Sequence, residues 1–101
     1  MSIEIFDEAS EVTVNQYYQI YKLPFHMQAG VERYLLHGIS GGSFLNAVLE
    51  NDLVGAFARA DDMNSAAMHN WVEWLYNSCP SNAWGSPEIV RDWCKKEGLK
   101  G

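Results

Sequence analysis

Apolar side chains recur every three or four residues through most of this 101-residue chain, and short polar or glycine-rich stretches interrupt them. This spacing places apolar groups on one face of a helix, whereas a half-buried strand alternates them. No two alternating segments joined by a hairpin signal stand out. The sequence therefore predicts an all-α fold, a compact bundle of about five short helices that forms a single domain over residues 1–101, with residues 1–10 as an extended arm.

The segment after the arm has two interpretations. Thr13 and Gln16 match a capping box, and the apolar residues that follow lie at helical spacing, which favours a helix over residues 13–22. Alternate residues of the same stretch would also share one face of a strand. The helical stripe is Val14, Tyr17, Tyr18 and Tyr21, and the strand face is Val12, Val14, Gln16, Tyr18 and Ile20.

Proline and glycine bound the next helix. Pro24 suits a first helical turn, and Gly38 supplies a left-handed stop. Apolar residues at helical spacing lie between them. The sequence predicts a helix from Pro24 to His37.

Residues 44–60 form either one helix or two. Ser43 is expected to be the N-cap before Phe44, and the apolar spacing continues to residue 60. A joint at Asn51 and Asp52 is physically reasonable, because asparagine tolerates the left-handed conformation and aspartate caps a new helix. Both alternatives stay open at this point.

Two further helices are predicted toward the C-terminus. Apolar residues between Ala67 and Tyr76 cover far more than one narrow face, so this helix is either central in the core or shared with another subunit. Ser86 and Pro87 provide an N-cap and a proline at the first position of the last helix. Gly98 is expected to end it.

Charge and hydropathy argue against several functions. The 13 acidic residues outnumber the 7 lysines and arginines, for a net charge of −6, so direct binding to nucleic acid is not expected. No apolar run approaches the roughly 18 residues of a membrane span, and acids stand where a secretory signal carries cations. Cys79 and Cys94 lack CxxC spacing and are expected to be reduced thiols. The expected location is the cytoplasm of the cell that makes the protein.

No pattern for catalysis or metal binding is complete. Residues 38–42 match GxSxG, but a helical pattern runs straight into Gly38, and the chain is too short for the α/β sheet of a nucleophile elbow. The three histidines lack the spacing of a zinc motif, so neither a metal nor a cofactor is expected. An enzymatic role would rest on Asp52, Asp61 or a histidine as general acid or base.

Polar side chains gather over residues 51–64, within an otherwise apolar stretch. Helix capping explains most of them. Arg59 remains, and it belongs either to a structural network with Asp62 or to a binding site. The candidate ligand- or partner-binding residues of this stretch are Asn51, Asp52, Arg59, Asp61 and Asn64.

Other segments add candidates. Trp84, close to Ser86, is either a hydrophobic staple at the start of the last helix or an exposed anchor for a partner. A glycine-serine loop before a helix start has free N–H groups that can hold an anion. A ring-rich helix can contribute to the interface of a homo-oligomer. The loop residues are Gly41, Gly42 and Ser43, and the rings belong to Trp71, Trp74 and Tyr76.

Several motifs occur together between residues 23 and 93. They are RYLLHG at residues 33–38, GGSFLNAVLENDL at 41–53, ADDMN at 60–64 and WGS at 84–86. In combination they resemble a group of small proteins encoded by tailed phages and prophages. The resemblance implies a phage origin and no particular mechanism.

These observations favour a protein that acts by binding. The first hypothesis is a homo-oligomeric phage accessory protein that inhibits a host protein stoichiometrically, as counter-defence or host takeover, since its Trp, Tyr and Met side chains can bury an interface. The alternative is an oligomer that sequesters a nucleotide immune signal, with rings stacking on the base and Arg59 or the Ser43 helix start holding phosphate. A structural role in phage assembly is the third.

Overall fold

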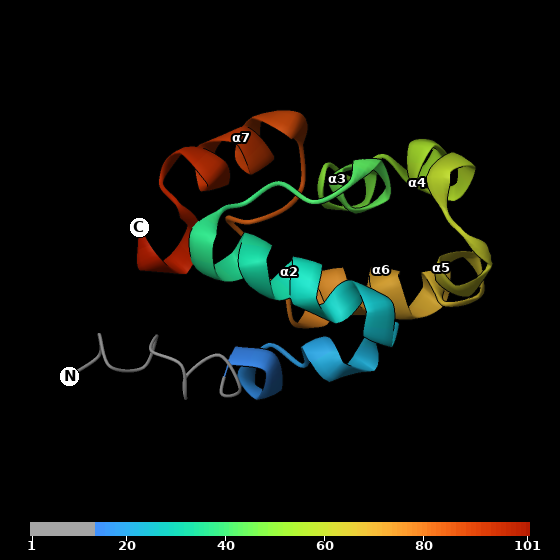
Figure 1. Cartoon of the computed structure of the whole chain (residues 1–101). Helices are drawn as coiled ribbons and strands as arrows, with labels where there is room; N and C mark the ends of the chain where they lie inside the picture. Colours follow the sequence, from blue (N-terminus) through green and yellow to red (C-terminus); the bar gives the residue numbers. More distant parts are fainter. Residues whose placement is uncertain (1–13) are drawn as a thin grey trace.

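The computed structural model describes residues 14–101, and every regular element in that range is a helix (Figure 1). The predicted all-α class is confirmed. The arm over residues 1–10 and the capping residue Thr13 lie outside the described residues. In chain order the elements are the 3-10 helix η2 (Ile20–Lys22), α2 (Phe25–His37), α3 (Ser43–Leu49), α4 (Leu53–Arg59), α5 (Asp62–Ala66), α6 (Met68–Asn77), α7 (Pro87–Lys95) and the 3-10 helix η3 (Gly98–Lys100).

The segment before α2 is helical where it is described. Residues 14–17 form a helical turn, and η2 follows at Ile20–Lys22, so the helix interpretation is confirmed over these residues. Between them Gln19 adopts a left-handed conformation with φ 57°, which breaks the segment into two short pieces. The strand alternative is therefore wrong for this part of the chain.

Helix α2 crosses the middle of the molecule (Figure 1) and contributes four buried residues to the core. Pro24 occupies the N-cap, so the helix begins at Phe25, one residue after the predicted start, and Gly38 ends it with φ 68°. Glycine adopts this left-handed conformation without the steric cost that a Cβ brings. The buried residues of α2 are Val31, Tyr34, Leu35 and Leu36.

The C-terminal end of the chain closes onto the end of α2. Gly98 has φ 71°, and a Cβ added there would lie 2.6 Å from the Leu35 carbonyl oxygen and 2.7 Å from the Gly38 nitrogen. Only glycine fits so close an approach of backbone to backbone. The prediction that Gly98 ends the last helix was wrong, because α7 already ends at Lys95 and Gly98 begins η3 instead.

Residues 44–60 form two helices with a joint at Asn51 and Asp52, which confirms the second of the two alternatives. Asn51 is left-handed with φ 65°, and the Asp52 carboxylate accepts a hydrogen bond from the Gly55 N–H at 2.9 Å. Ser43 is the first residue of α3 rather than its N-cap. That prediction was wrong because Gly42 takes the extended conformation of the cap position.

The remaining helices start at capping side chains. Asp61 caps α5 by accepting a hydrogen bond from the Asn64 N–H at 2.7 Å. Ser86 caps α7 by accepting from the Ile89 N–H at 3.2 Å, and Pro87 follows as the first helical residue, as predicted. These caps satisfy N–H groups that a helix start otherwise leaves without partners.

Three tryptophan rings fill the core. Trp71, Trp74 and Trp93 are each no more than 2% exposed. Two of them also join distant segments, because the Trp74 Nε1–H donates to the Tyr18 carbonyl at 2.7 Å and the Trp93 Nε1–H donates to the Tyr34 carbonyl at 2.8 Å. The radius of gyration, 12.9 Å, is that of a compact domain of this length.

Candidate functional site

An apolar groove opens between α4 and α6. One face of helix α6 forms the floor of the groove. The apolar residues on this face recur at positions i, i+3, i+4, i+7 and i+8, which lie on the same side of a helix. The three that point inward are buried, whereas Val72 is 48% exposed and Tyr76 is 80% exposed. The stripe therefore runs from the core onto open surface. It consists of Met68, Trp71, Val72, Leu75 and Tyr76.

Helix α4 forms the facing wall, through Leu53 and Ala56, and Val48 of α3 completes it. The joint at Asn51 and Asp52 sets the position of this wall, because it folds α4 back onto α3. Helix α4 packs closely on α3 but makes no extensive contact with α6. Figure 1 shows α3 and α4 together on one side, with α5 and α6 on the other. Phe44 of α3 packs against Trp71 of α6, and the apolar surface between α4 and α6 is left open.

Trp84 lines the groove as well, and the loop after Pro80 holds it there. The N–H of Gly85, the next residue, donates to the Leu49 carbonyl at the end of α3 at 2.8 Å. The Tyr34 hydroxyl donates to the carbonyl of Ala83, the preceding residue, at 2.7 Å. Trp84 is partly buried against the core. Its backbone is therefore fixed on both sides.

The groove encloses about 170 Å³. This is close to the roughly 150 Å³ of an engineered apolar cavity, in another protein, that binds benzene. Its polar side chains are few: Asn51, Asp52 and the Tyr76 hydroxyl. One oxygen of Asp52 already caps α4. The groove is thus suited to one large apolar side chain or one ring.

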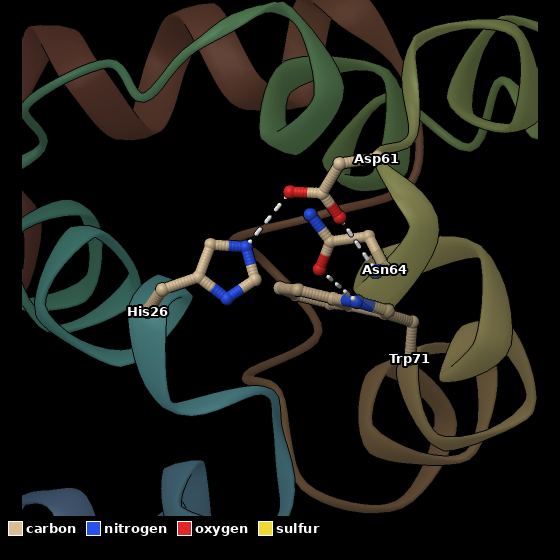
Figure 2. Close-up of polar contacts among 4 residues, drawn as sticks. All are labelled: His26, Asp61, Asn64 and Trp71. Atoms are coloured by element: carbon tan, nitrogen blue, oxygen red, sulfur yellow. Dashed lines mark hydrogen bonds and ion pairs between the residues drawn. The ribbon is translucent and has the colours of Figure 1, made fainter.

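A chain of polar contacts connects the groove floor with the surface (Figure 2). The Trp71 Nε1–H donates to Asn64 Oδ1 at 3.2 Å, and Asn64 is 3% exposed. The Asn64 N–H in turn donates to Asp61 Oδ1, and the other oxygen of Asp61 lies 3.0 Å from His26 Nε2. The contacts fix the Trp71 ring relative to α5 and the first turn of α2.

Hydrogen bonding and burial shift several pKa values. The hydrogen bond that Asp61 accepts from the Asn64 N–H lowers the pKa of Asp61, and burial opposes this shift. The hydrogen bond with His26 lowers the pKa further. Burial raises the pKa of both cysteines, Cys79 and Cys94. Burial also raises the pKa of Tyr34. Asp61 is therefore a carboxylate near neutral pH, while the thiols stay protonated and are poor nucleophiles.

Only some of the predicted binding residues meet. Asn51, Asp52 and Trp84 line the groove. Asp61 and Asn64 lie outside its lining and support it through Trp71. The lining thus joins residues from the 51–64 stretch with the loop before α7.

The other candidates serve their own helices. Ser86 caps α7 and does not line the groove. The Arg59 Nη1–H donates to the Gly55 carbonyl at 3.1 Å, within α4, and Arg59 forms no ion pair with Asp62. Local helix geometry accounts for both.

The structure also places the candidates of the glycine-serine loop and of the ring-rich helix α6. Gly42 and Ser43 are exposed at the start of α3, a helix of seven residues, and anion binding there stays a prediction. Trp71 and Trp74 are buried within the chain, so of the three proposed interface rings only Tyr76 is exposed, and a homo-oligomer stays a prediction.

The sequence did not single out most of the groove residues. Leu53, Ala56 and Met68 read as ordinary members of apolar stripes. A signal was present in α6, where apolar residues cover more than one face. Sequence spacing could not show which part of that surface stays open, because this depends on the distance between α4 and α6.

Comparison with protein-family models, curated proteins and solved structures found no match. Among residues 14–101, no helix has the length and apolar character needed to cross a membrane. Within the same range, no three His, Cys, Asp or Glu side chains gather as a metal site would require. The groove and the motifs in the sequence are the features of this chain that bear on its function.

Proposed function

We propose that this chain acts by stoichiometric binding and that the groove between α4 and α6 receives a large apolar side chain of a partner protein. The observation that carries the proposal is an apolar groove whose lips are exposed to solvent. On α4 the exposed lip is Leu53, and on α6 the lip is formed by Val72 and Tyr76. Residues that dominate the binding energy of protein interfaces are typically large side chains seated in such pockets.

The energetics are adequate for specific recognition. Full burial of one large apolar side chain is worth roughly 1.5–3 kcal/mol. Covering the exposed lips adds apolar area on both partners. Trp71 and Trp84 offer rigid aromatic walls, since the former is hydrogen-bonded to Asn64 and the loop of the latter is tied to α3. Preorganised walls lower the entropic cost of binding.

The resemblance to small proteins of tailed phages and prophages suggests the biological setting. A counter-defence or host-takeover protein in the host cytoplasm can inhibit a host protein by covering its surface, and it needs no active site for this. We therefore propose a host protein as the partner. Tyr76 and Trp84 are the ring-bearing residues best placed to contact it.

A nucleotide is less well matched to the same groove. Trp84 and Tyr76 could stack on a base, but the groove is lined by Asp52 and by no lysine or arginine to hold phosphate. Arg59 donates to the Gly55 carbonyl instead. A nucleotide would bring negative charge next to a carboxylate, which is unfavourable.

The proposal is tested with indole, the ring of a tryptophan side chain, as an apolar probe. Indole at millimolar concentration is expected to shift the amide NMR signals of groove residues and to raise the melting temperature of the full chain. The groove variant, Val72→Ser with Tyr76→Ser, should lose both effects. A matched control, Phe25→Ser with Tyr21→Ser, replaces two exposed rings outside the groove and should keep them.

Capture from host-cell extract extends the test to the natural partner. The wild-type chain and the control variant are expected to retain the same host protein, and the groove variant is expected to lose it. Capture that is equal for wild type and groove variant, or indole shifts that avoid the groove, would contradict the proposal. Stabilisation by nucleotides but not by indole would favour the sequestering function instead.

A further inference from the structure

We infer that the partner element seated in the groove is an amphipathic helix whose apolar stripe is flanked by lysine or arginine. This inference rests on the proposed function and deepens it. It draws on two observations: the shape of the apolar surface and the distribution of charge over the molecule.

The shape favours a helix over an extended strand. The groove lies between two helices, and the described chain has no strand whose edge could pair with an extended peptide. Exposed apolar side chains border the groove on both helices, with Leu53 on α4 and Val72 and Tyr76 on α6, and two more residues of α4, Val54 and Phe57, are exposed outside the groove lining. A helix that presents apolar residues at i, i+3 or i+4, and i+7 matches two such lips, with its largest side chain in the central cavity.

Charge selects a basic partner. Residues 50–73, which include α4, α5 and most of α6, contain five carboxylates and a single lysine or arginine, Arg59. Glu73 is exposed beside Val72 on α6, and Asp52 adjoins Leu53 at the start of α4. The carboxylates are Glu50, Asp52, Asp61, Asp62 and Glu73.

Contacts within the chain leave most of the negative charge of these carboxylates in place. Glu73 lies 3.2 Å from His69 Nε2, and Asp61 lies 3.0 Å from His26 Nε2. Arg59 is the nearest permanent cation in the sequence, and its guanidinium bonds to the Gly55 carbonyl. Surrounding acids attract a basic partner, mainly by increasing the association rate, and they oppose an acidic one.

A second copy of this chain fits less well. The remaining cations of the described residues lie on η2, α2 and the C-terminal elements, away from the groove-forming segments. Most of them gather around α7 and η3, where no described large apolar side chain is exposed, and beside these elements Ile39 is a single exposed apolar residue. A second copy could therefore offer charge from that end, but not the apolar stripe that the groove requires. These cations are Lys22, Arg33, Arg91, Lys95, Lys96 and Lys100.

The test uses two designed, fluorescein-labelled amphipathic peptides with the same leucine stripe, one carrying lysine and the other glutamate on the polar face. Binding to the full chain is followed by fluorescence anisotropy at low and at raised salt. The lysine peptide should bind at least about tenfold tighter than the glutamate peptide, and the preference should shrink as salt rises. Amide shifts should place the lysine peptide on α4 and α6.

Two pairs of variants separate charge from apolar contact. Glu73→Lys should weaken binding of the lysine peptide several-fold, whereas Asp92→Lys, the same change on exposed α7, should not. The groove variant, which leaves the net charge unchanged, should abolish binding that the Phe25 and Tyr21 control retains. Equal effects of the two charge reversals, or retention by the groove variant, would identify nonspecific attraction and overturn the inference.

The outcomes also separate this inference from the function on which it rests. If indole enters the groove but the two peptides bind equally or not at all, the binding function stands and the basic-helix partner is rejected. If neither indole nor a peptide perturbs the groove, both fail. A concentration-dependent dimer that the groove variant dissolves would assign the groove to a second copy and overturn the inference.

Discussion

Asn64 is a buried polar side chain in an apolar environment, and its oxygen accepts the Trp71 indole N–H. Its backbone N–H also holds the capping carboxylate of Asp61. The same residue therefore donates the N–H that Asp61 caps at the start of α5 and orients a ring of the groove floor. The sequence suggested Asn64 as a binding residue, but burial leaves its side chain inaccessible to a partner.

Replacing Asn64 should destabilise the fold more than its size suggests. Asn64→Leu leaves the buried Trp71 N–H without an acceptor, which should cost about 1–3 kcal/mol of unfolding free energy, measured by urea denaturation. In an Asn64→Leu, Trp71→Phe double-mutant cycle, the double variant should lose less unfolding free energy than the sum of the losses in the two single variants. Asn70→Ala, an exposed change on α6, should stay within about 0.5 kcal/mol. Similar losses at Asn64 and Asn70 would refute this role.

Short helices depend on their ends, because few internal turns support them. Helices α4 and α5 have seven and five residues, and each begins at an aspartate that accepts a backbone N–H. Asp61 also contacts His26, which joins the start of α5 to the first turn of α2. This cap therefore supports the arrangement of elements as well as one helix.

The Asp61 cap should make stability depend on pH on the acid side. The pKa of Asp61 is lower in the folded chain than in the unfolded chain, so its contribution is complete above the unfolded pKa and is lost as pH falls through the folded pKa. Asp61→Asn keeps a capping oxygen without the titration. The stability difference between wild type and this variant, from urea denaturation at stepwise lower pH, should shrink toward acid pH. A constant difference would contradict the assignment.

On the scale of the whole molecule, long-range contacts hold short elements together. The indole N–H groups of Trp74 and Trp93 bond to backbone carbonyls more than 50 residues earlier, at Tyr18 and Tyr34. Near the C-terminus, Gly38 and Gly98 bring two backbone segments into close contact. Because no single helix is independently stable, we expect the described core to open cooperatively.

Cys79 reports on that opening. Its thiol is buried and its pKa is raised, so a thiol reagent should reach it only when the chain unfolds. In a Cys94→Ser background, labelling should be roughly a thousandfold or more slower than in urea, as a stability near 5 kcal/mol implies. Cys94, measured in a Cys79→Ser background, is more exposed and should react faster. Rapid native labelling of Cys79 would show that the core opens locally.

The sequence by itself determined the class of fold and most of the helix ends. Gly38 stops α2, Asn51 and Asp52 separate α3 from α4, and Ser86 with Pro87 starts α7. These features were predictable because capping and left-handed conformations depend on a residue and its immediate neighbours. The shift of the Ser43 cap to Gly42 shows that even local signals can miss by one position.

Tertiary structure alone decided which apolar residues became core and which became surface. Trp71 and Val72 are neighbours on a helix whose apolar residues cover far more than one narrow face, yet the ring is buried and the valine lies at an open lip. The groove exists because α4 folds back onto α3 and stays apart from α6, while the loop after Pro80 brings Trp84 across. Such distances depend on many contacts between residues far apart in the chain, and no local pattern encodes them.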